Sequence, residues 1–307
     1  NNGSATLNGT RGQVMVEIPV FSVRHQGDAI GTNTRHQWSV ALGVVNTGGY
    51  EVHPAFVKPD GSIRYYIYIG AYQGTGTNGN GSISGANNTT NMTRAECRSA
   101  CAGRGAGWHS QGYWEYNAVQ WLLFTEYQDM NSQRVLGNGA ANGSVYNVNT
   151  GLSNNRGNRC GHKTSSSGST TDYVSYRGLE NVYGRSWQWV DGFNVYNLDV
   201  YLNNNPATWA DDTSTGYTAS GTVPSVGHSG AYIRDLLAQT AFLPSSVTGA
   251  SGTTYTGDAL WTSTGWRVAD VGGGANNGAP VGALCLALIH DSSSRSSSVG
   301  GRLAYAN

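Results

Sequence analysis

Short runs of β-branched and aromatic residues, separated by long stretches of Gly, Asn and Ser, dominate this chain. Three such runs lie in its first quarter, at 12–24, 36–45 and 63–72, and they have the composition of strands. Pro19 indicates an edge or an irregularity in the first run. Residues 58–62, with a proline and a glycine, have turn chemistry. The first part of the chain therefore predicts β structure.

The composition shows how such a chain can fold. It contains 44 Gly, 18 Tyr and 9 Trp in 307 residues, and 12% of its residues are charged. Disordered chains are poor in aromatics and high in net charge, so we expect a folded, loop-rich protein whose aromatics supply the buried area. Lys plus Arg equals Asp plus Glu, 18 each, which predicts no attraction to nucleic acid or membrane lipid.

No membrane-spanning or secretory segment is predicted. The sequence has no run of about 18 apolar residues, the length that a spanning helix needs, and no signal peptide with a basic start. The chain begins at Asn1 without a methionine. We therefore expect a processed or truncated piece of a longer protein.

Two helices are predicted in the middle of the chain. Thr93, followed three residues later by Glu96, forms a capping box that starts the first. The second is expected from about Ser110 to Met130, where one helical stripe carries Trp114, Ala118, Trp121, Leu122 and Thr125. Segment 73–93 is rich in Gly, Asn, Ser and Thr, and is expected to be a flexible connector without a packed face.

Later strands follow the same alternating pattern. Residues 193–204 alternate like one strand, and shorter strand candidates lie at 266–273, 282–291 and 301–306. The chain has four cysteines, Cys97, Cys101, Cys160 and Cys285, too few for a disulfide scaffold. Buried thiols or one disulfide are favoured. A zinc site would need Cys160 and His162 to join the helical pair Cys97 and Cys101.

The segment "LENVYGRSWQWVDG", residues 179–192, resembles the hallmark turn of the formylglycine-generating-enzyme-like (sulfatase-modifying-factor) family. Two more landmarks of that family follow in order, in "VGGGANNG" and in the closing "VGGRLAYAN". The matching positions are Gly184, Trp187, Trp189, Gly272, Gly273, Asn276, Asn277, Gly300, Arg302 and Leu303. The departures are Arg185, Ser186, Gln188 and Ala275. Trp187 and Trp189 are expected to anchor the core from one face of an extended segment, with ligand stacking as the alternative.

The first half, including "GTRGQVMVEIPVF" and "TRAECRSACAGRGAGWHSQGYWEYNAVQW", is similar to phage and prophage tail-adhesin-type proteins of the same fold. The resemblance implies an α+β, C-type-lectin-like fold with small twisted antiparallel sheets, two helices and long irregular Gly/Asn/Ser-rich loops. This fold is also used by the variable proteins of diversity-generating retroelements. It implies a single domain over 1–307, with an N-terminal β part (1–72), a helical part (93–130) and a lectin core with display loops (173–307).

The enzymatic chemistry of the family is not expected to carry over. Its oxidases hold copper with a pair of cysteines in the C-terminal part, where this chain has only Cys285. Asp211 and Asp212 are adjacent, so on a strand they would point to opposite faces, which does not suit a glycosidase pair. Other carboxylates could meet only in the folded chain, namely Glu126, Glu180, Asp191 and Asp199. We predict no catalytic residues.

The resemblance implies that loops between the Gly-Gly-x-x-Asn-Asn turn and the last strand form the binding face. Segment 274–298 is rich in short polar side chains, which can bind when a scaffold fixes the loop ends. The predicted ligand contacts are Asn276, Asn277, His290, Asp291, Ser293 and Arg295, flanked by Trp261 and Trp266. Glu180 and Asn181 are expected to bond backbone amides of nearby loops, with calcium as the alternative. No other cofactor is expected.

The leading hypothesis is a phage virion adhesin, at a tail or fibre, that recognises a bacterial surface glycan or protein without catalysis. Its expected partners are that receptor, other virion proteins and further copies of the chain, by analogy as a trimer. Its expected location is the virion or the extracellular space. The alternative is a structural virion component, a head decoration or fibre subunit. An envelope-acting enzyme or a formylglycine-generating-type oxidase is the third hypothesis.

Overall fold

The computed structural model describes residues 6–30, 33–237 and 239–307. Its helices are α1 (Arg94–Ala102), α2 (Tyr113–Tyr127) and α3 (Ser132–Leu136), and its 3-10 turns are Pro54–Phe56, Thr77–Gly79, Asn154–Arg156 and Pro206–Thr208. The capping box is confirmed, because Thr93 Oγ1 accepts from the Glu96 amide at 3.1 Å and the Thr93 amide donates to Glu96 Oε2 at 2.9 Å. Helix α3 was not predicted. In the described part of the chain, no helix has the length and apolar character to cross a membrane.

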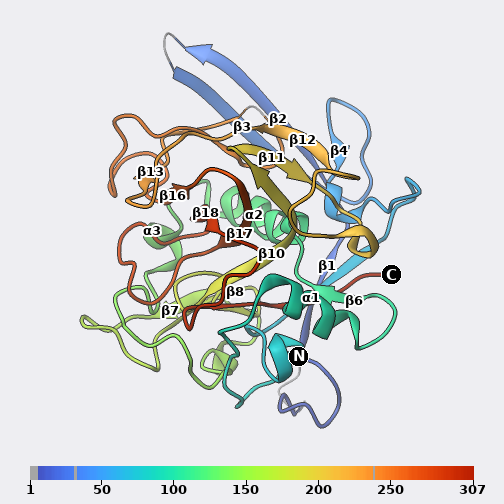
Figure 1. Ribbon diagram of the computed structural model, residues 1–307, viewed down its shortest axis with the longest axis vertical. Coiled ribbons are helices and arrows are strands. Elements are labelled where there is room, and N and C mark those ends of the chain that lie inside the picture. Colours follow the sequence, from blue (N-terminus) through green and yellow to red (C-terminus); the bar gives the residue numbers. More distant parts are fainter. Residues whose placement is uncertain (1–5, 31–32, 238) are drawn as a thin grey trace.

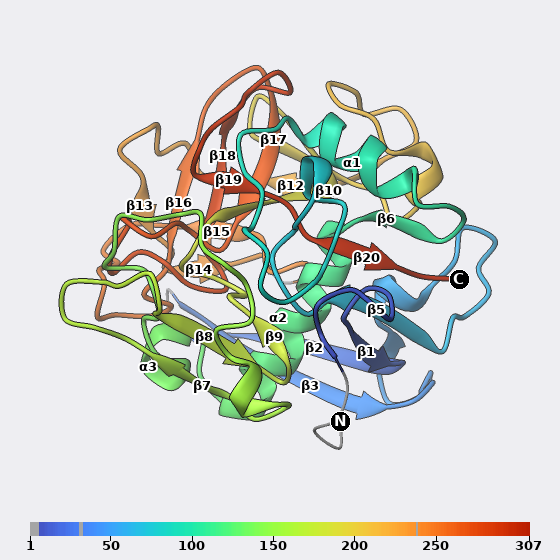
Figure 2. The same ribbon diagram turned by 90° about the horizontal axis from the view of Figure 1, so that it is seen from below.

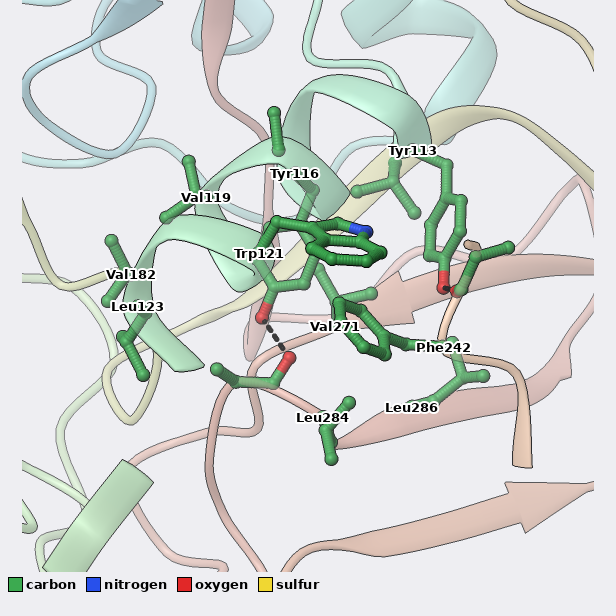
Figure 3. Close-up of a cluster of buried hydrophobic side chains, with 14 of the residues drawn as sticks. Tyr113, Tyr116, Val119, Trp121, Leu123, Val182, Phe242, Val271, Leu284 and Leu286 are labelled. Carbon is green, nitrogen blue, oxygen red and sulfur yellow. Dashed lines mark hydrogen bonds between the residues drawn. The ribbon is translucent and has the colours of Figure 1, made fainter. Parts of the chain in front are cut away.

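Helix α2 is shorter and more deeply buried than the sequence predicts. Tyr116, Val119 and Leu123, which lie outside the expected stripe, are buried. Trp114, Leu122 and Thr125, which belong to the stripe, are only partly buried. The predicted stripe therefore does not coincide with the buried residues, because α2 crosses the centre of the molecule with strands and loops packed around it (Figure 1). Figure 3 shows Trp121 of α2 against Phe242, whose ring centroid is 5.1 Å away.

The strands form small, largely antiparallel sheets. The four-stranded sheet has the order β1 (Met15–Pro19), β5 (Tyr66–Gly70), β20 (Leu303–Tyr305), β6 (Trp108–Ser110). The eight-stranded sheet has the order β12 (Thr218–Thr222), β11 (Asp199–Leu202), β10 (Trp187–Tyr196), β17 (Trp266–Val271), β18 (Leu286–His290), β16 (Ala259–Thr262), β13 (Ala231–Tyr232), with β19 (Val299–Gly300) beside β10. The predicted α+β class, with small sheets and long irregular loops, is confirmed.

Three further sheets complete the fold. Their orders are β14 (Asp235–Leu236), β15 (Pro244–Ser246); β3 (Asn33–Leu42), β2 (Phe21–Ile30), β4 (Glu51–Val52); and β7 (Gly161–Lys163), β8 (Tyr173–Tyr176), β9 (Leu179–Glu180). The β2–β3 hairpin projects from one end of the molecule (Figure 1). The last strand, β20, lies between β5 and β6 (Figure 2), so segments from both ends of the chain share one sheet.

The single strand expected at 193–204 is instead a hairpin. Strand β10 ends at Tyr196, and β11 returns from Asp199 with Tyr196 opposite Asp199. The two turn residues, Asn197 and Leu198, have φ angles of 49° and 78°, the positive values that two-residue hairpin turns require. The prediction was wrong because both strands keep the same period of two, and a leucine in the turn gives no turn signal.

Segment 73–93 is packed, which contradicts the expected connector without a packed face. A Cβ atom on Gly74 would lie 2.5 Å from the Gly79 carbonyl oxygen. The backbone at Gly74 therefore packs directly against the backbone at Gly79. Gln73 Nε2 donates to the Ser186 carbonyl at 2.9 Å, and Asn88 Nδ2 donates to Ser186 Oγ at 2.9 Å. Glycines and amide side chains thus let a polar segment pack by hydrogen bonding.

Two hydrophobic cores lie on either side of the eight-stranded sheet. The larger surrounds α2. The second lies against α1 and contains Met92, Cys97, Cys101, Trp187, Trp189, Val268, Cys285, Ala287, Val299 and Leu303. Trp187 is 8% exposed and Trp189 1%, and Trp189 Nε1 donates to the Met92 carbonyl at 3.0 Å. Their expected role as same-face core anchors is confirmed.

The motif segments contact one another. Gly184, with a φ angle of 84°, donates its amide to the Gly272 carbonyl at 3.0 Å, and Gly273 has a φ angle of 71°. The buried Arg302 guanidinium donates to the carbonyls of Gly70, Glu180 and Asn181 at 2.8, 2.7 and 2.9 Å. Gly300 pairs with β10.

Two of the departures from the family motif also have buried roles. Gln188 accepts from Arg302 Nε at 2.8 Å. The Arg185 guanidinium donates to the Asp172 and Val145 carbonyls at 2.5 and 2.8 Å. These side chains therefore bind neighbouring loops to the turn instead of disturbing it.

Candidate functional site

The predicted contact residues lie on strands β16, β17 and β18 and on the loops that follow them. These strands are neighbours in the eight-stranded sheet, and they carry Trp261, Trp266 and His290. The loop after β17 carries Asn276 and Asn277, and residues 291–298, here termed the display loop, carry Asp291, Ser293 and Arg295. The fold therefore brings residues from five segments to one region.

The pairing register places several of these residues on one sheet face. Trp266, Val268 and Asp270 alternate on β17 and so share a face. Opposite them lie Tyr196 on β10 and His290 on β18. Helix α1 and the second core cover part of this face, and its uncovered part lies around Trp266.

Three aromatic rings, here termed the aromatic patch, lie at that uncovered part. The ring of Trp266 is 4.8 Å from that of Tyr196 and 6.3 Å from that of Tyr201, centroid to centroid. Tyr196 is 43% exposed. Neither tyrosine was predicted as a contact, because a single strand over 193–204 does not bring residues 196 and 201 together.

His290 lies beside this patch, where it is partly buried and hydrogen-bonded to the buried Asp270. Its Nδ1 lies 3.0 Å from Asp270 Oδ1, and its ring stands edge-on to Trp189 at 5.5 Å. Burial disfavours the charged form, but the hydrogen bond and the charge of Asp270 outweigh it, so the pKa of His290 lies above its ordinary value. Among the residues that the structure describes, Asp270 Oδ2 finds no hydrogen-bond partner.

Trp261 and Asn277 belong to a second group. The ring of Trp261 stands 5.5 Å from that of Trp187. Asn277 Oδ1 accepts from Trp187 Nε1 at 3.0 Å and from the Gly274 amide at 2.8 Å. The side chain of Asn277 thus holds its own turn in shape, while the neighbouring Asn276 is exposed.

Charged contacts hold the display loop at three points. Asp291 pairs with Arg267 of β17, and Arg295 pairs with Glu96 of α1. Ser292 Oγ donates to Asp212 Oδ2 at 2.5 Å. Residues 291, 293, 295 and 297 are exposed and alternate with partly buried ones. The scaffold therefore fixes the loop while every second side chain faces solvent.

The carboxylates considered for chemistry are engaged in the fold. Glu126 pairs with Arg177 at 2.5 Å, and Asp191 with Arg98 at 2.6 Å. Asp211 contacts Arg94 and Arg98, and Asp199 accepts from Thr222 Oγ1 at 2.5 Å.

The oxygens considered for calcium are also hydrogen-bonded. Glu180 accepts from the amides of Gly151 and Ser153 at 3.0 and 2.6 Å, and Asn181 Oδ1 accepts from the Val174 amide at 3.2 Å. These are the backbone contacts that the sequence analysis favoured.

The cysteines are free thiols. Cys97, Cys101 and Cys285 are buried and Cys160 is partly buried, so the expectation of buried thiols holds for three of them and no disulfide forms. The hydrogen bond with Cys101, together with burial, raises the pKa of Cys97. No cluster of three or more His, Cys, Asp and Glu side chains suited to a metal ion occurs among the described residues.

A groove with a volume of about 1010 Å³ lies elsewhere, between β1, β3 and α2. None of the predicted contact residues lines it. Its Glu126 and Arg177 pair with each other, and Glu17 accepts from Tyr68 Oη at 2.8 Å. Since its charged groups are already engaged, we place the candidate site on the sheet face rather than in this groove.

Comparison with known proteins gives few matches. No family model matches the chain, and no curated protein does. Among solved structures, the chain is similar to a "Major Tropism Determinant U1 Variant", with 11% identity and a TM-score of 0.38. It is also similar to a "Major Tropism Determinant P3c Variant", with 10% identity and a TM-score of 0.39. Each alignment covers 99% of this chain and 84% of the other.

Proposed function

We propose that this chain is an adhesin of a phage virion, which binds a glycan or protein on the bacterial surface and carries out no chemistry. The observation that supports it best is the gathering of the aromatic patch, His290 and the display loop on one sheet face. Exposed tyrosine and tryptophan rings supply contact area at low entropic cost, and short polar side chains supply adaptable hydrogen bonds. The motif resemblance of the sequence favours the same role.

The virion setting and the assembly belong to the same proposal. An adhesin at a tail or fibre tip would act as a homo-oligomer beside other virion proteins, and a trimer suits such a tip. Several copies that bind one cell together raise the overall avidity without any new contact. Modest affinity at each face would then suffice for attachment.

A whole-cell binding assay tests this proposal. The labelled, purified chain is incubated with a panel of intact bacterial species, and the proposal predicts saturable binding to a subset of them. Trp266→Ser and Tyr196→Ser are expected to lower that binding by about tenfold or more. Tyr65→Ser is the matched control, since Tyr65 is a 64% exposed tyrosine outside this face.

Two outcomes would count against the proposal. Binding that Tyr65→Ser reduces as strongly as Trp266→Ser would place the contact elsewhere. A chain that binds no species in the panel, yet assembles into particles with virion proteins, would favour the structural role instead.

A further inference from the structure

A second groove, of about 560 Å³, lies between β6, the loop that follows α1, the 3-10 turn Pro206–Thr208 and the end of the chain. Its charged lining groups are Arg64, Arg98 and His109. Trp108, Trp209 and Pro206 form apolar walls, and Asn205 adds an amide. In Figure 1, β6 and the C-terminus lie on the same side of the molecule. The volume falls within the range of about 300–1,000 Å³ typical of small-ligand sites.

Two of the three cations have carboxylate partners. Arg98 contacts Asp191 and Asp211, at 2.6 and 2.5 Å. His109 Nε2 lies 2.6 Å from Glu115 Oε1, and its Nδ1 lies 2.9 Å from the Gly107 carbonyl oxygen. Oxygens on both sides of the imidazole favour its doubly protonated form. These charges are therefore balanced within the fold.

Arg64 has no such partner. Its Nε is buried without an acceptor, and no ion pair or side-chain hydrogen bond joins its guanidinium to any residue that the structure describes. Glu115 attracts it only at longer range, and burial lowers the pKa of Arg64. Leaving a partly buried cation unsatisfied is costly. The fold therefore keeps one uncompensated positive charge at this groove.

We propose that this groove binds a carboxylate-bearing sugar, with the carboxylate on the Arg64 guanidinium. One free positive charge matches one carboxylate, and the planar guanidinium can hold both carboxylate oxygens at once. The apolar walls suit the C–H faces of a sugar ring, and Asn205 suits its hydroxyl groups. None of the lining residues belongs to the face proposed for receptor binding, so this inference stands or falls separately from that function.

Calorimetric titration of the full chain tests the proposal with sodium glucuronate, glucose, acetate and inorganic phosphate. We expect glucuronate to bind, and glucose, which has the same ring without the carboxylate, to bind about tenfold more weakly or worse. Acetate is expected to bind more weakly than glucuronate because it lacks the sugar ring. Phosphate is expected to bind more weakly because its charge does not match a single positive charge.

Substitutions distinguish a direct contact of Arg64 with the carboxylate from a general electrostatic effect of the positive charges of the protein. Arg64→Met should weaken glucuronate binding about tenfold or more, while Arg64→Lys should weaken it less because the charge remains. Arg159→Met is the control, since Arg159 is an exposed arginine outside the groove, and it should bind glucuronate as the wild type does. Thermal unfolding of each variant checks that it is folded.

Several results would overturn the proposal. One is the absence of glucuronate binding to the wild type. If glucose bound as tightly as glucuronate, or if a folded Arg64→Met variant bound glucuronate as the wild type does, the carboxylate would not be recognised by Arg64. Phosphate or acetate that binds as tightly as glucuronate would remove the sugar acid as the ligand.

Discussion

Arg302 ties three separate segments of the chain together. Its buried guanidinium donates to carbonyls on β5, at the end of β9 and in the turn that follows β9, and to Gln188 on β10. A lysine offers donors from one point and cannot reach all these acceptors. Burial lowers the pKa of Arg302 to about 10, so the side chain is still charged near neutral pH.

We predict that Arg302→Lys lowers the free energy of unfolding by about 2 kcal/mol or more, because buried carbonyls lose their donors. Urea denaturation measures this. Arg159→Lys, an exposed control, should change the free energy by less than about 0.5 kcal/mol. An equally small effect of Arg302→Lys would mean that these hydrogen bonds do not hold the segments together.

His290 gives the fold a dependence on pH. Since Asp270 raises the pKa of His290 in the folded chain, the protonated imidazole contributes its full stabilisation below the unfolded pKa of about 6.5, as long as Asp270 is ionised. The contribution is lost as the pH rises through the higher folded value. NMR titration should find the His290 imidazole pKa above 6.5, and His290→Gln should remove this part of the stability profile.

The control for that prediction is His162→Gln, because His162 is exposed. In this variant, the His290 resonance should titrate as it does in the wild type. A measured pKa for His290 at or below its ordinary value would contradict the assigned pairing with Asp270.

Helix α1 begins with a capping box at Thr93 and Glu96, and the same Glu96 also pairs with Arg295 of the display loop. We predict that Thr93→Ala, which removes the side-chain acceptor of the capping box, costs about 1 kcal/mol in unfolding free energy. Thr253→Ala is the control, since Thr253 lies in an exposed loop. Thermal or urea denaturation compares the two, and equal effects would contradict the importance of the cap.

The ion pair between Glu96 of α1 and Arg295 of the display loop is expected to restrain the loop without contributing much to the free energy of unfolding. Arg295→Met should leave the unfolding free energy within about 1 kcal/mol, because exposed ion pairs contribute little. It should nevertheless speed hydrogen exchange of amides 292–297, since one of the three attachment points is lost. Unchanged exchange across the loop would show that Glu96 does not restrain it.

Local sequence patterns predicted the presence of single helices and strands better than they predicted how those elements pack against the rest of the chain. The capping box at Thr93 and the β-branched strand runs depend on neighbours in sequence, and both were found. The reversal at Asn197 and Leu198 was missed because period two is the same before and after a turn. The burial of α2 on nearly all sides depends on segments far away in the chain, which periodicity does not report.

The candidate site shows the same division. His290 was predicted within the motif-based segment 274–298 and Trp266 as a residue that flanks it, and the register of β17 and β18 places the two on one face. Asn277, predicted as a contact, holds its own turn through Trp187 and Gly274. Tyr196 and Tyr201 reach the patch only through the hairpin, and Arg64 reaches its groove only through tertiary packing. A single sequence does not indicate directly that Tyr196 and Tyr201 meet in the patch, or that Arg64 lies in its groove.

For the molecule as a whole, we propose that one face of the eight-stranded sheet binds the bacterial surface. The most direct measurement is hydrogen exchange of the chain, free and bound to envelope from a species that it recognises. We predict protection at 197–201, 263–267 and 291–297, with little change at 58–66. Protection confined to 58–66, or to the groove between β1, β3 and α2, would contradict it.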